Sequence, residues 1–227
     1  MTLLFSSDWH LCMRNLEPCR CAVDQICEIL SKSARPRYFA HLGDIVGDRG
    51  PANPLDVRVT NFLIEEFPKS RKQSDATVFV RGNHDMIATP DGVPSCVPLL
   101  NAIGFDMIAD ADFTCFQLAT AWVWMVPYFR DPVRQKRAFL DAHKSILGSG
   151  VKILLFHNEI AGAERNAWSK GEGLTMEDIG ASSYDLCVAG HLHRPQFIKP
   201  NLYFVGAPYP TDWGDANARQ RFLKVEL

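Results

Sequence analysis

The sequence lacks the features that mark membrane-bound, secreted and strongly charged proteins. Among its 227 residues, no apolar run approaches the roughly 20 residues that a membrane-spanning helix needs. The start of the chain has no basic segment ahead of an apolar one, so we expect no signal peptide and no membrane partner. The formal net charge is only −2, which argues against a protein that coats nucleic acid through bulk charge. These absences predict a cytoplasmic globular protein.

Cysteines are present, but they lack paired spacing. Their number is odd, seven, and no two of them form a Cys-x-x-Cys pair. A zinc site made by Cys12, Cys19 and Cys21 is an alternative, but we expect reduced thiols that pack as small apolar side chains. With 47% apolar residues, the chain can bury a sizeable core without disulfides.

Repeats and Gly/Ser-rich linkers are also lacking, so we expect a single domain over residues 1–227. Short apolar runs alternate with amphipathic segments, which is typical of an α/β layered fold. Strands are expected at residues 2–5, 38–42, 77–80, 113–118, 122–126, 151–156, 186–189, 196–198 and 202–205. Helices are expected at residues 18–31, 54–67, 97–103 and 131–146. Residues 221–226 alternate in polarity and are expected to close the edge of a sheet.

Side chains that can bind metals follow the expected strands, where each strand ends. They are Asp8, His10, Asp44, Asn83, His84, His157, His191 and His193. Five of the seven histidines lie at such ends, and only His41 and His143 do not. Because ligand sites in α/β sheets gather beyond the carboxyl ends of strands, we expect these side chains to form one site.

Each motif alone is weak, since Asp-x-His, Gly-Asp and even Gly-Asn-His-Asp also occur in ordinary turns. The order in which all these motifs follow one another along the chain is more specific than any single motif. Carboxylate, imidazole and amide ligands suit manganese, iron or zinc better than copper(I). A bridging carboxylate can hold two ions about 3.5–4 Å apart, close enough to share a hydroxide that attacks a phosphoryl group.

The motifs resemble those of the calcineurin-like metallophosphoesterases. They read Asp8-Trp9-His10, Gly43-Asp44, Gly82-Asn83-His84-Asp85, His157 and Gly190-His191-Leu192-His193. The resemblance implies a four-layer α/β/β/α sandwich of two mixed sheets. It also implies two divalent metal ions, with Mn²⁺ expected first and Fe²⁺, Zn²⁺ or Ni²⁺ as alternatives.

The resemblance further assigns a role to each residue. Asp44 would bridge the two ions; Asp8, His10 and His193 would complete one site, and Asn83, His157 and His191 the other. His84 would be catalytic, either stabilising the phosphoryl group or protonating the leaving oxygen, and Asp85 would orient the His84 imidazole.

Within this superfamily, the chain is most similar to the SbcD-type nucleases of DNA repair. Residues 42–46, 183–196 and 206–215 carry this similarity, although Ala207, Trp213 and Asp215 depart from the usual Ser, Phe and Glu. The similarity implies a DNA exonuclease or endonuclease. The residues that follow cannot hold a DNA-capping domain or an ATPase-binding region, so a separate SMC-like ATPase subunit is the expected partner.

A small-molecule phosphodiesterase or phosphomonoesterase on the same core is the alternative to a nuclease. A scaffold without turnover is disfavoured, because no expected ligand is missing. Basic residues at 130–137 and 69–72 are candidate contacts to a DNA backbone. Trp9, Tyr209 and Trp213 lie in or near the motif loops and are candidates for stacking on a base.

Overall fold

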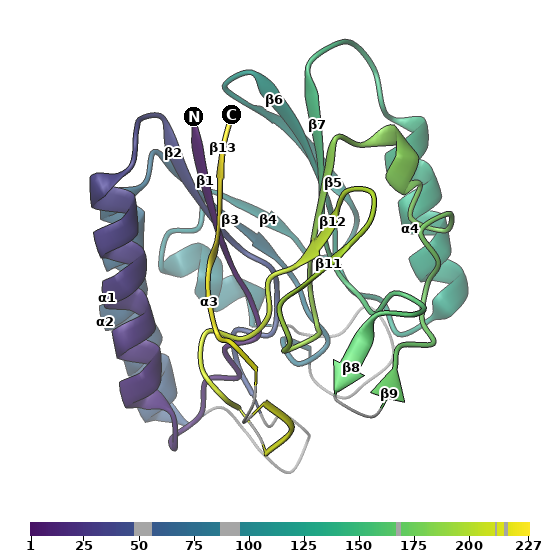
Figure 1. Ribbon diagram of the computed structural model, residues 1–227. Helices are drawn as coiled ribbons and strands as arrows, with labels where there is room; N and C mark the ends of the chain where they lie inside the picture. Colours follow the sequence, from purple (N-terminus) through teal and green to yellow (C-terminus); the bar gives the residue numbers. More distant parts are fainter. Residues whose placement is uncertain (48–55, 87–95, 167–168, 212, 216–217) are drawn as a thin grey trace.

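Two mixed β-sheets pack face to face between layers of helices. The computed structural model describes residues 1–47, 56–86, 96–166, 169–211, 213–215 and 218–227. Helices α1 (Leu16–Lys32) and α2 (Val57–Gln73) cover the outer face of one sheet, and α4 (Pro132–Lys144) covers the outer face of the other (Figure 1). The expected four-layer α/β/β/α sandwich is confirmed.

The first sheet contains the first four strands of the chain and the last one. Its order is β13 (Leu223–Glu226), β1 (Thr2–Ser6), β2 (Arg37–His41), β3 (Ala76–Val80) and β4 (Met107–Ala109). Strands β1 to β4 run parallel, whereas β13 pairs antiparallel with β1. The expectation that the C-terminal strand closes a sheet edge is confirmed.

The second sheet is also mixed. Its order is β11 (Gln196–Ile198), β12 (Leu202–Phe204), β10 (Leu186–Gly190), β7 (Val151–His157), β6 (Ala121–Val126) and β5 (Thr114–Leu118). The four central strands are parallel, and the two outer ones are antiparallel to their neighbours. Strands β5 and β6 pair as an antiparallel hairpin, at the positions of the strands expected at residues 113–118 and 122–126.

Three apolar cores fill the spaces between the layers. Phe39, Ile26 and Phe62 belong to the core between the first sheet and its helices, where short helix α3 (Val97–Ala102) also contributes Leu100. A second core lies between the sheets, and a third lies under α4. The central strands are therefore buried on both faces, which explains their nearly continuous apolar sequences.

Some elements differ from the sequence-based expectation. Helix α2 continues to Gln73 through Pro68, because its buried face extends to Phe67 and Ser70. This packing outweighs the cost of a proline inside a helix, which is about 3 kcal/mol. Strand β4 and the hairpin of β8 (Glu164–Asn166) and β9 (Ser169–Lys170) were not expected. Strands β8 and β9 contain polar residues alone, so they carry no apolar signal. Residues 54 and 55 of the expected second helix lie outside the described residues.

All seven cysteines are free thiols; Cys19 is buried and Cys21 is exposed. Two short 3-10 helices complete the elements, η1 (Ala181–Ser183) and η2 (Trp213–Asp215). Within the described part of the chain, no helix combines the length and the apolar character that crossing a membrane requires.

Candidate metal centre

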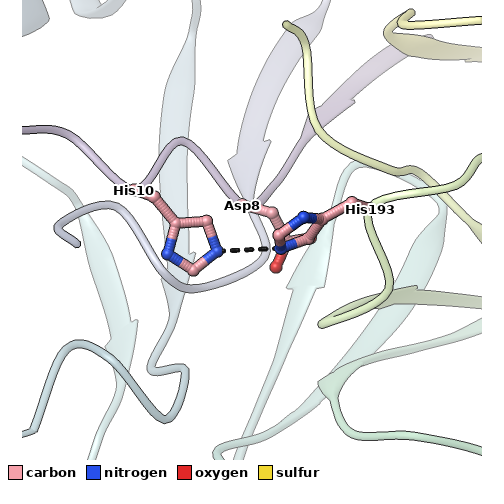
Figure 2. A group of neighbouring side chains, drawn as sticks. All are labelled: Asp8, His10 and His193. Atoms are coloured by element: carbon pink, nitrogen blue, oxygen red, sulfur yellow. Dashed lines mark hydrogen bonds between the residues drawn. The ribbon is translucent and has the colours of Figure 1, made fainter. Parts of the chain in front are cut away.

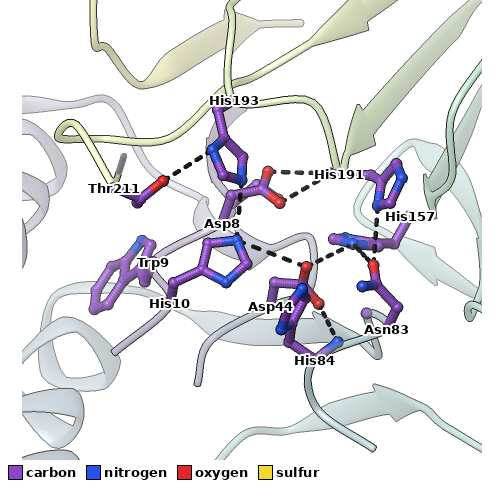
Figure 3. Close-up of polar contacts among 12 residues, drawn as sticks. Asp8, Trp9, His10, Asp44, Asn83, His84, His157, His191, His193 and Thr211 are labelled. Carbon is purple, nitrogen blue, oxygen red and sulfur yellow. Dashed lines mark hydrogen bonds and ion pairs between the residues drawn. The ribbon is translucent and has the colours of Figure 1, made fainter. Parts of the chain in front are cut away.

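The carboxyl ends of five strands meet at one edge of the sandwich, and the predicted metal-binding side chains lie there together (Figure 3). Strand β1 leads into Asp8 and His10, β2 into Asp44, and β3 into Asn83 and His84. Strand β7 ends at His157, and His191 and His193 follow β10. The strand-end argument made from the sequence thus identifies side chains that are neighbours in space.

Most of these side chains form two adjacent groups. Asp8, His10 and His193 make one (Figure 2), and Asp44, His157 and His191 make the other. His10, Asp44 and His84 form a third group that overlaps both. Within each group, the potential ligand atoms lie within 4.8 Å of one another. In the first group, Nε2 of His10 is 3.0 Å from Nε2 of His193. The division agrees with the one that the family resemblance implies.

The Asp44 carboxylate lies between the two groups. Its Oδ2 atom is 3.8 Å from Nε2 of His10 and 3.2 Å from Nε2 of His157. Asn83 completes the second group, because its Oδ1 atom is 3.1 Å from Nε2 of His157 and 2.9 Å from Nδ1 of His191. Asp44 therefore occupies the position from which one carboxylate can serve two ions.

Backbone strain is concentrated in this centre. Positive φ angles occur at Asp8 (56°), His10 (43°), Asp44 (54°) and His191 (84°), and Ala119 (48°) is the other non-glycine residue with such an angle in the described chain. A conformation of this kind costs of order 1–3 kcal/mol at each residue and persists where the surroundings impose it. The surrounding fold thus imposes the backbone conformation of four candidate ligands.

Two motif glycines allow the loops to approach closely. Gly43 has a φ of 91°, and a Cβ atom there would lie 2.5 Å from Nδ1 of His157. A Cβ atom on Gly190 would lie 2.1 Å from Oγ of Ser7. Any larger residue at either position would push apart the strand ends that carry the candidate ligands.

Hydrogen bonds behind the centre fix the orientation of two rings. Nδ1 of His157 lies 2.6 Å from the carbonyl oxygen of Leu42, to which it donates. Nδ1 of His193 lies 3.0 Å from Oδ2 of Asp215 and 2.8 Å from the hydroxyl of Thr211. In both rings, Nε2 is left to face the centre, as is usual for metal-binding histidines.

Burial controls the protonation of the rings. Burial lowers the pKa of His10 to about 3 and that of His191 to about 4, so both rings are neutral at pH 7. Burial also lowers the pKa of His157, but the Asp44 carboxylate outweighs this effect and raises it to about 9. Asp44 therefore favours a positive charge at this position, and a divalent cation can supply it as well as a proton can.

The residues present fit a pair of divalent cations. Imidazole nitrogens, carboxylate oxygens and an amide oxygen converge on a small volume. This donor set suits hard to borderline ions such as manganese, iron or zinc.

Asp85 has a different position from the one expected. It is fully buried, and its carboxylate accepts hydrogen bonds from the backbone amides of Gly82 (2.8 Å), Asp44 (2.8 Å) and Ile45 (2.9 Å). Among the described contacts, none joins it to the His84 imidazole. Buried amides require acceptors, so the carboxylate turns inward and holds the Asp44 loop. The expected orientation of His84 by Asp85 is wrong.

His84 lies on the open side of the centre. Its backbone amide donates to Oδ1 of Asp44 at 2.7 Å, and its ring lies 4.7 Å from the His10 ring, centroid to centroid. The side chain lines a cleft of about 770 Å³ that also contains Asp44 and His193. We name this volume the metal cleft. His84 is therefore accessible to a substrate in the cleft.

Several residues of the site were not identified from the sequence. Arg14 and Arg165 line the metal cleft, and Thr211 and Asp215 support His193. Asp215 and Thr211 belong to the segment that resembles the nucleases, but the sequence alone gave them no role. Arg165 lies on β8, a strand without a sequence signal.

The candidate stacking aromatics fall into two classes. Trp9 and Tyr209 are buried, with the Tyr209 hydroxyl donating to the carbonyl oxygen of Trp9 at 2.6 Å. Their expected role in stacking on a base is wrong, because both rings pack in the core beneath α1 and α2. Trp213, by contrast, is 95% exposed.

The two basic clusters are largely neutralised by ion pairs. Lys136 pairs with Asp178 at 3.0 Å and Arg137 with Asp141 at 2.7 Å. In the second cluster, Arg71 pairs with Asp106 at 2.8 Å, and Lys69 pairs with Glu66. These ion pairs reduce the free positive charge of both clusters, which argues against either one as a surface that binds the phosphate backbone of DNA.

Comparison with known proteins agrees with this geometry. The calcineurin-like phosphoesterase family matches residues 1–195 of the chain. The chain belongs to this family. Calcineurin-like phosphoesterases use a dimetal centre, and the two side-chain groups described above are the candidate ligands for it.

Individual relatives show how far the likeness extends. The chain is 27% identical over 225 residues to "Putative phosphoesterase 078R" of Invertebrate iridescent virus 3, covering 95% of this chain but 60% of that protein. In structure it is similar to GAP50, the anchor in the inner membrane complex of Plasmodium (TM-score 0.58, 13% identity, 98% of this chain and 76% of that one). It is also similar to a 5′-nucleotidase precursor from Thermus thermophilus (TM-score 0.55, 15% identity, 95% and 49%). At such identities, the structural neighbours show the fold alone.

Proposed function

We propose that the protein is a dimetal phosphodiesterase that cleaves DNA, as an exonuclease or endonuclease, with Mn²⁺ as its metal. The observation that carries this proposal is the metal cleft, which is open to solvent and has Arg14 on its wall beside the candidate ligands, together with Arg165, which is paired with Glu159. Arginine pairs well with phosphate oxygens, and a polynucleotide presents further phosphates on both sides of the bond to be cleaved.

Trp213 gives a second line of support. It is 95% exposed, and it begins η2, the short helix that also contains Asp215. Aromatic rings near a phosphate-binding cleft stack on unpaired bases with little regard to sequence. An exposed ring joined directly to the support of His193 is thus suited to hold a strand end.

The proposed chemistry assigns each residue one task. Two divalent cations, when bound, supply Lewis acidity and a water of lowered pKa. Asp44 holds the two groups of ligands together, and Arg14 and Arg165 orient the substrate phosphate. His84 donates a proton to the leaving oxygen, since it faces the cleft and stands next to His10.

The alternative function is that of a phosphodiesterase or phosphomonoesterase of small molecules. The net charge of −2 and the neutralised basic clusters favour this alternative, because a DNA-binding surface usually carries excess positive charge. A separate SMC-like ATPase partner is part of the nuclease proposal, and its support is the likeness of residues 42–46, 183–196 and 206–215 to those nucleases.

A gel assay decides between these functions. End-labelled single- and double-stranded DNA would be incubated with the Mn²⁺-loaded protein, with His84→Ala, and with the protein in EDTA, alongside bis-p-nitrophenyl phosphate. Cleavage of DNA by the wild type alone supports the nuclease. Turnover of the nitrophenyl ester without DNA cleavage supports the small-molecule alternative.

A further inference from the structure

A second cavity lies beside the metal cleft. It has a volume of about 360 Å³, within the usual range for ligand pockets, and Tyr128, Phe129, Lys136, Asn158, Glu159 and His191 are among its lining residues. We call it the side pocket. His191 lines both the side pocket and the metal cleft, so a candidate metal ligand forms the border between them.

Glu159 fixes this border. Its carboxylate accepts hydrogen bonds from Arg165, which lines the metal cleft, and from the backbone amide of Glu172 at 2.6 Å. Oε2 of the same carboxylate lies 4.0 Å from Nε2 of His191. The two cavities are thus adjacent volumes separated by a rigid wall, with the metal centre next to both.

Tyr128 is the aromatic ring that the side pocket offers to a ligand. The Phe129 ring is 3% exposed and has the guanidinium groups of Arg134 and Arg81 over it, at 4.2 and 5.3 Å. The Tyr128 ring is partly exposed and nearly parallel to that of His191, with an angle of 20° between them and 6.3 Å between centroids. A flat ligand group can therefore lie against Tyr128 beside the metal centre.

The polar groups of the pocket favour a ligand with N–H donors. Asn158 is 7% exposed, and its Oδ1 atom has no hydrogen-bond partner in the described chain. Glu172 adds a carboxylate to the same wall, whereas the carboxylate of Glu159 is already paired with Arg165. A buried acceptor without a partner is costly, and a donor on the ligand would remove that cost. Flat aromatic character together with N–H donors describes a nucleobase.

The position of His84 decides which part of the substrate enters the side pocket. His84 lines the metal cleft and lies beside His10, whereas Tyr128 lines the side pocket and lies beside His191, which belongs to the other group of candidate ligands. If His84 protonates the leaving oxygen, the leaving arm of the ester lies in the cleft. We propose that the side pocket binds the nucleobase of the other ester group, the nucleoside that stays bonded to the phosphate after cleavage. This inference rests on the proposed phosphodiesterase function, and it favours diesters, because a monoester has no second arm.

Two substrates with the same leaving group test the inference. The p-nitrophenyl ester of thymidine 5′-monophosphate keeps a nucleoside on the phosphate, and methyl p-nitrophenyl phosphate keeps only a methyl group. We expect KM for the methyl ester to exceed that for the nucleoside ester by about 10-fold, which corresponds to about 1.4 kcal/mol. Tyr128→Ala should bring the ratio of the two KM values close to one, and Tyr128→Phe should preserve it. Phe197→Ala is the matched control, since Phe197 is an exposed aromatic residue that lines neither cavity.

Equal KM values for the wild type, or an equal change for both substrates in Tyr128→Ala, would overturn the inference. If the nucleoside ester is preferred but DNA is not cut, the result supports the base-binding pocket and contradicts the proposal that DNA is the substrate. If neither ester is turned over, the proposed function fails, and direct binding decides the inference. Calorimetry with thymidine 5′-monophosphate and the metal-free protein should then show binding that Tyr128→Ala weakens; equal affinities would overturn it.

Discussion

Nδ1 of His193 donates a hydrogen bond to the carboxylate of Asp215, at 3.0 Å, and Nε2 of the same ring faces His10. The carboxylate is held in turn by the amide and hydroxyl of Thr211, at 3.0 and 2.7 Å. Carboxylates placed behind a ligating imidazole fix its tautomer and its orientation. Asp215 is thus a positioning residue for the first group of candidate ligands.

Replacing Asp215 should weaken metal binding without removing a ligand. We expect Asp215→Ala to lower Mn²⁺ affinity by about 10–100-fold, the usual effect of losing such a support. Calorimetric titration of the metal-free protein measures this change. Asp215→Asn keeps a hydrogen-bond acceptor, so its Mn²⁺ affinity should lie between those of the wild type and Asp215→Ala. Glu28→Ala is the control: it removes an acid paired with Lys32 on the surface and should bind Mn²⁺ as the wild type does. Unchanged affinity in Asp215→Ala would contradict the role.

His84→Ala separates catalysis from metal binding. If His84 donates the proton to the leaving oxygen, its loss should reduce kcat by about 10²–10⁴-fold while the content of bound metal stays near that of the wild type. Mass-spectrometric metal analysis and turnover of an unmodified dinucleotide, whose leaving alkoxide requires a proton, measure the two quantities on one sample. His84 also belongs to a possible ligand group with His10 and Asp44. Loss of metal in this variant would therefore make His84 a ligand and refute its separate role.

Asp44 and Asp8 should differ in the number of ions that each one holds. Both have positive φ angles, 54° and 56°, which asparagine tolerates better than most residues. Asp44→Asn removes the carboxylate between the two groups, so we expect both ions to be lost. Asp8→Asn should lose one ion, since Asp8 belongs to one group. Metal-to-protein ratios after gel filtration give the answer, with circular dichroism as the check on folding. Retention of two ions by Asp44→Asn would exclude the bridging role.

His41 should make the protein sensitive to acid. Its ring is fully buried against Phe79 and Trp9, and neither ring nitrogen has a hydrogen-bond partner in the described structure. Burial, followed by the charge of His157, lowers its pKa from 6.5 to about 3. Between these pH values the unfolded chain binds a proton that the folded protein does not. The free energy of unfolding should therefore fall with decreasing pH by up to about 1.4 kcal/mol per unit, and the fall should end below pH 3.

His41→Phe should remove this part of the pH dependence, because phenylalanine keeps the ring contacts and cannot be protonated. Urea unfolding of both proteins in EDTA, from pH 7.5 to pH 4, would measure the difference without a contribution from bound metal. The two curves should diverge as the pH falls below about 6.5. Parallel curves would show that the pKa of His41 does not differ between the folded and unfolded states. His41→Leu serves as a second variant if phenylalanine is too large for the site.

The sequence by itself determined the alternation of buried strands with helices and the identity of the candidate ligands, and the family resemblance of the motifs added the four layers. Strands such as Val151–His157 are buried on both faces, so their apolar runs are visible without any structure. The side chains that follow them reach one edge because parallel strands end together. These are local signals, and they do not depend on how distant segments meet.

The tertiary structure decided what each polar or aromatic side chain contacts. Tyr209 donates to a carbonyl oxygen 200 residues away, and this contact places the ring in the core rather than in the cleft. Asp85 turned inward because the amides of Asp44 and Ile45, on another loop, needed an acceptor. The side pocket likewise exists only where Tyr128, Asn158 and His191 come together from three strand ends. A sequence period reveals whether a face is buried, but hydrogen-bond partners and cavities are set by packing between elements, so they became visible only in the folded chain.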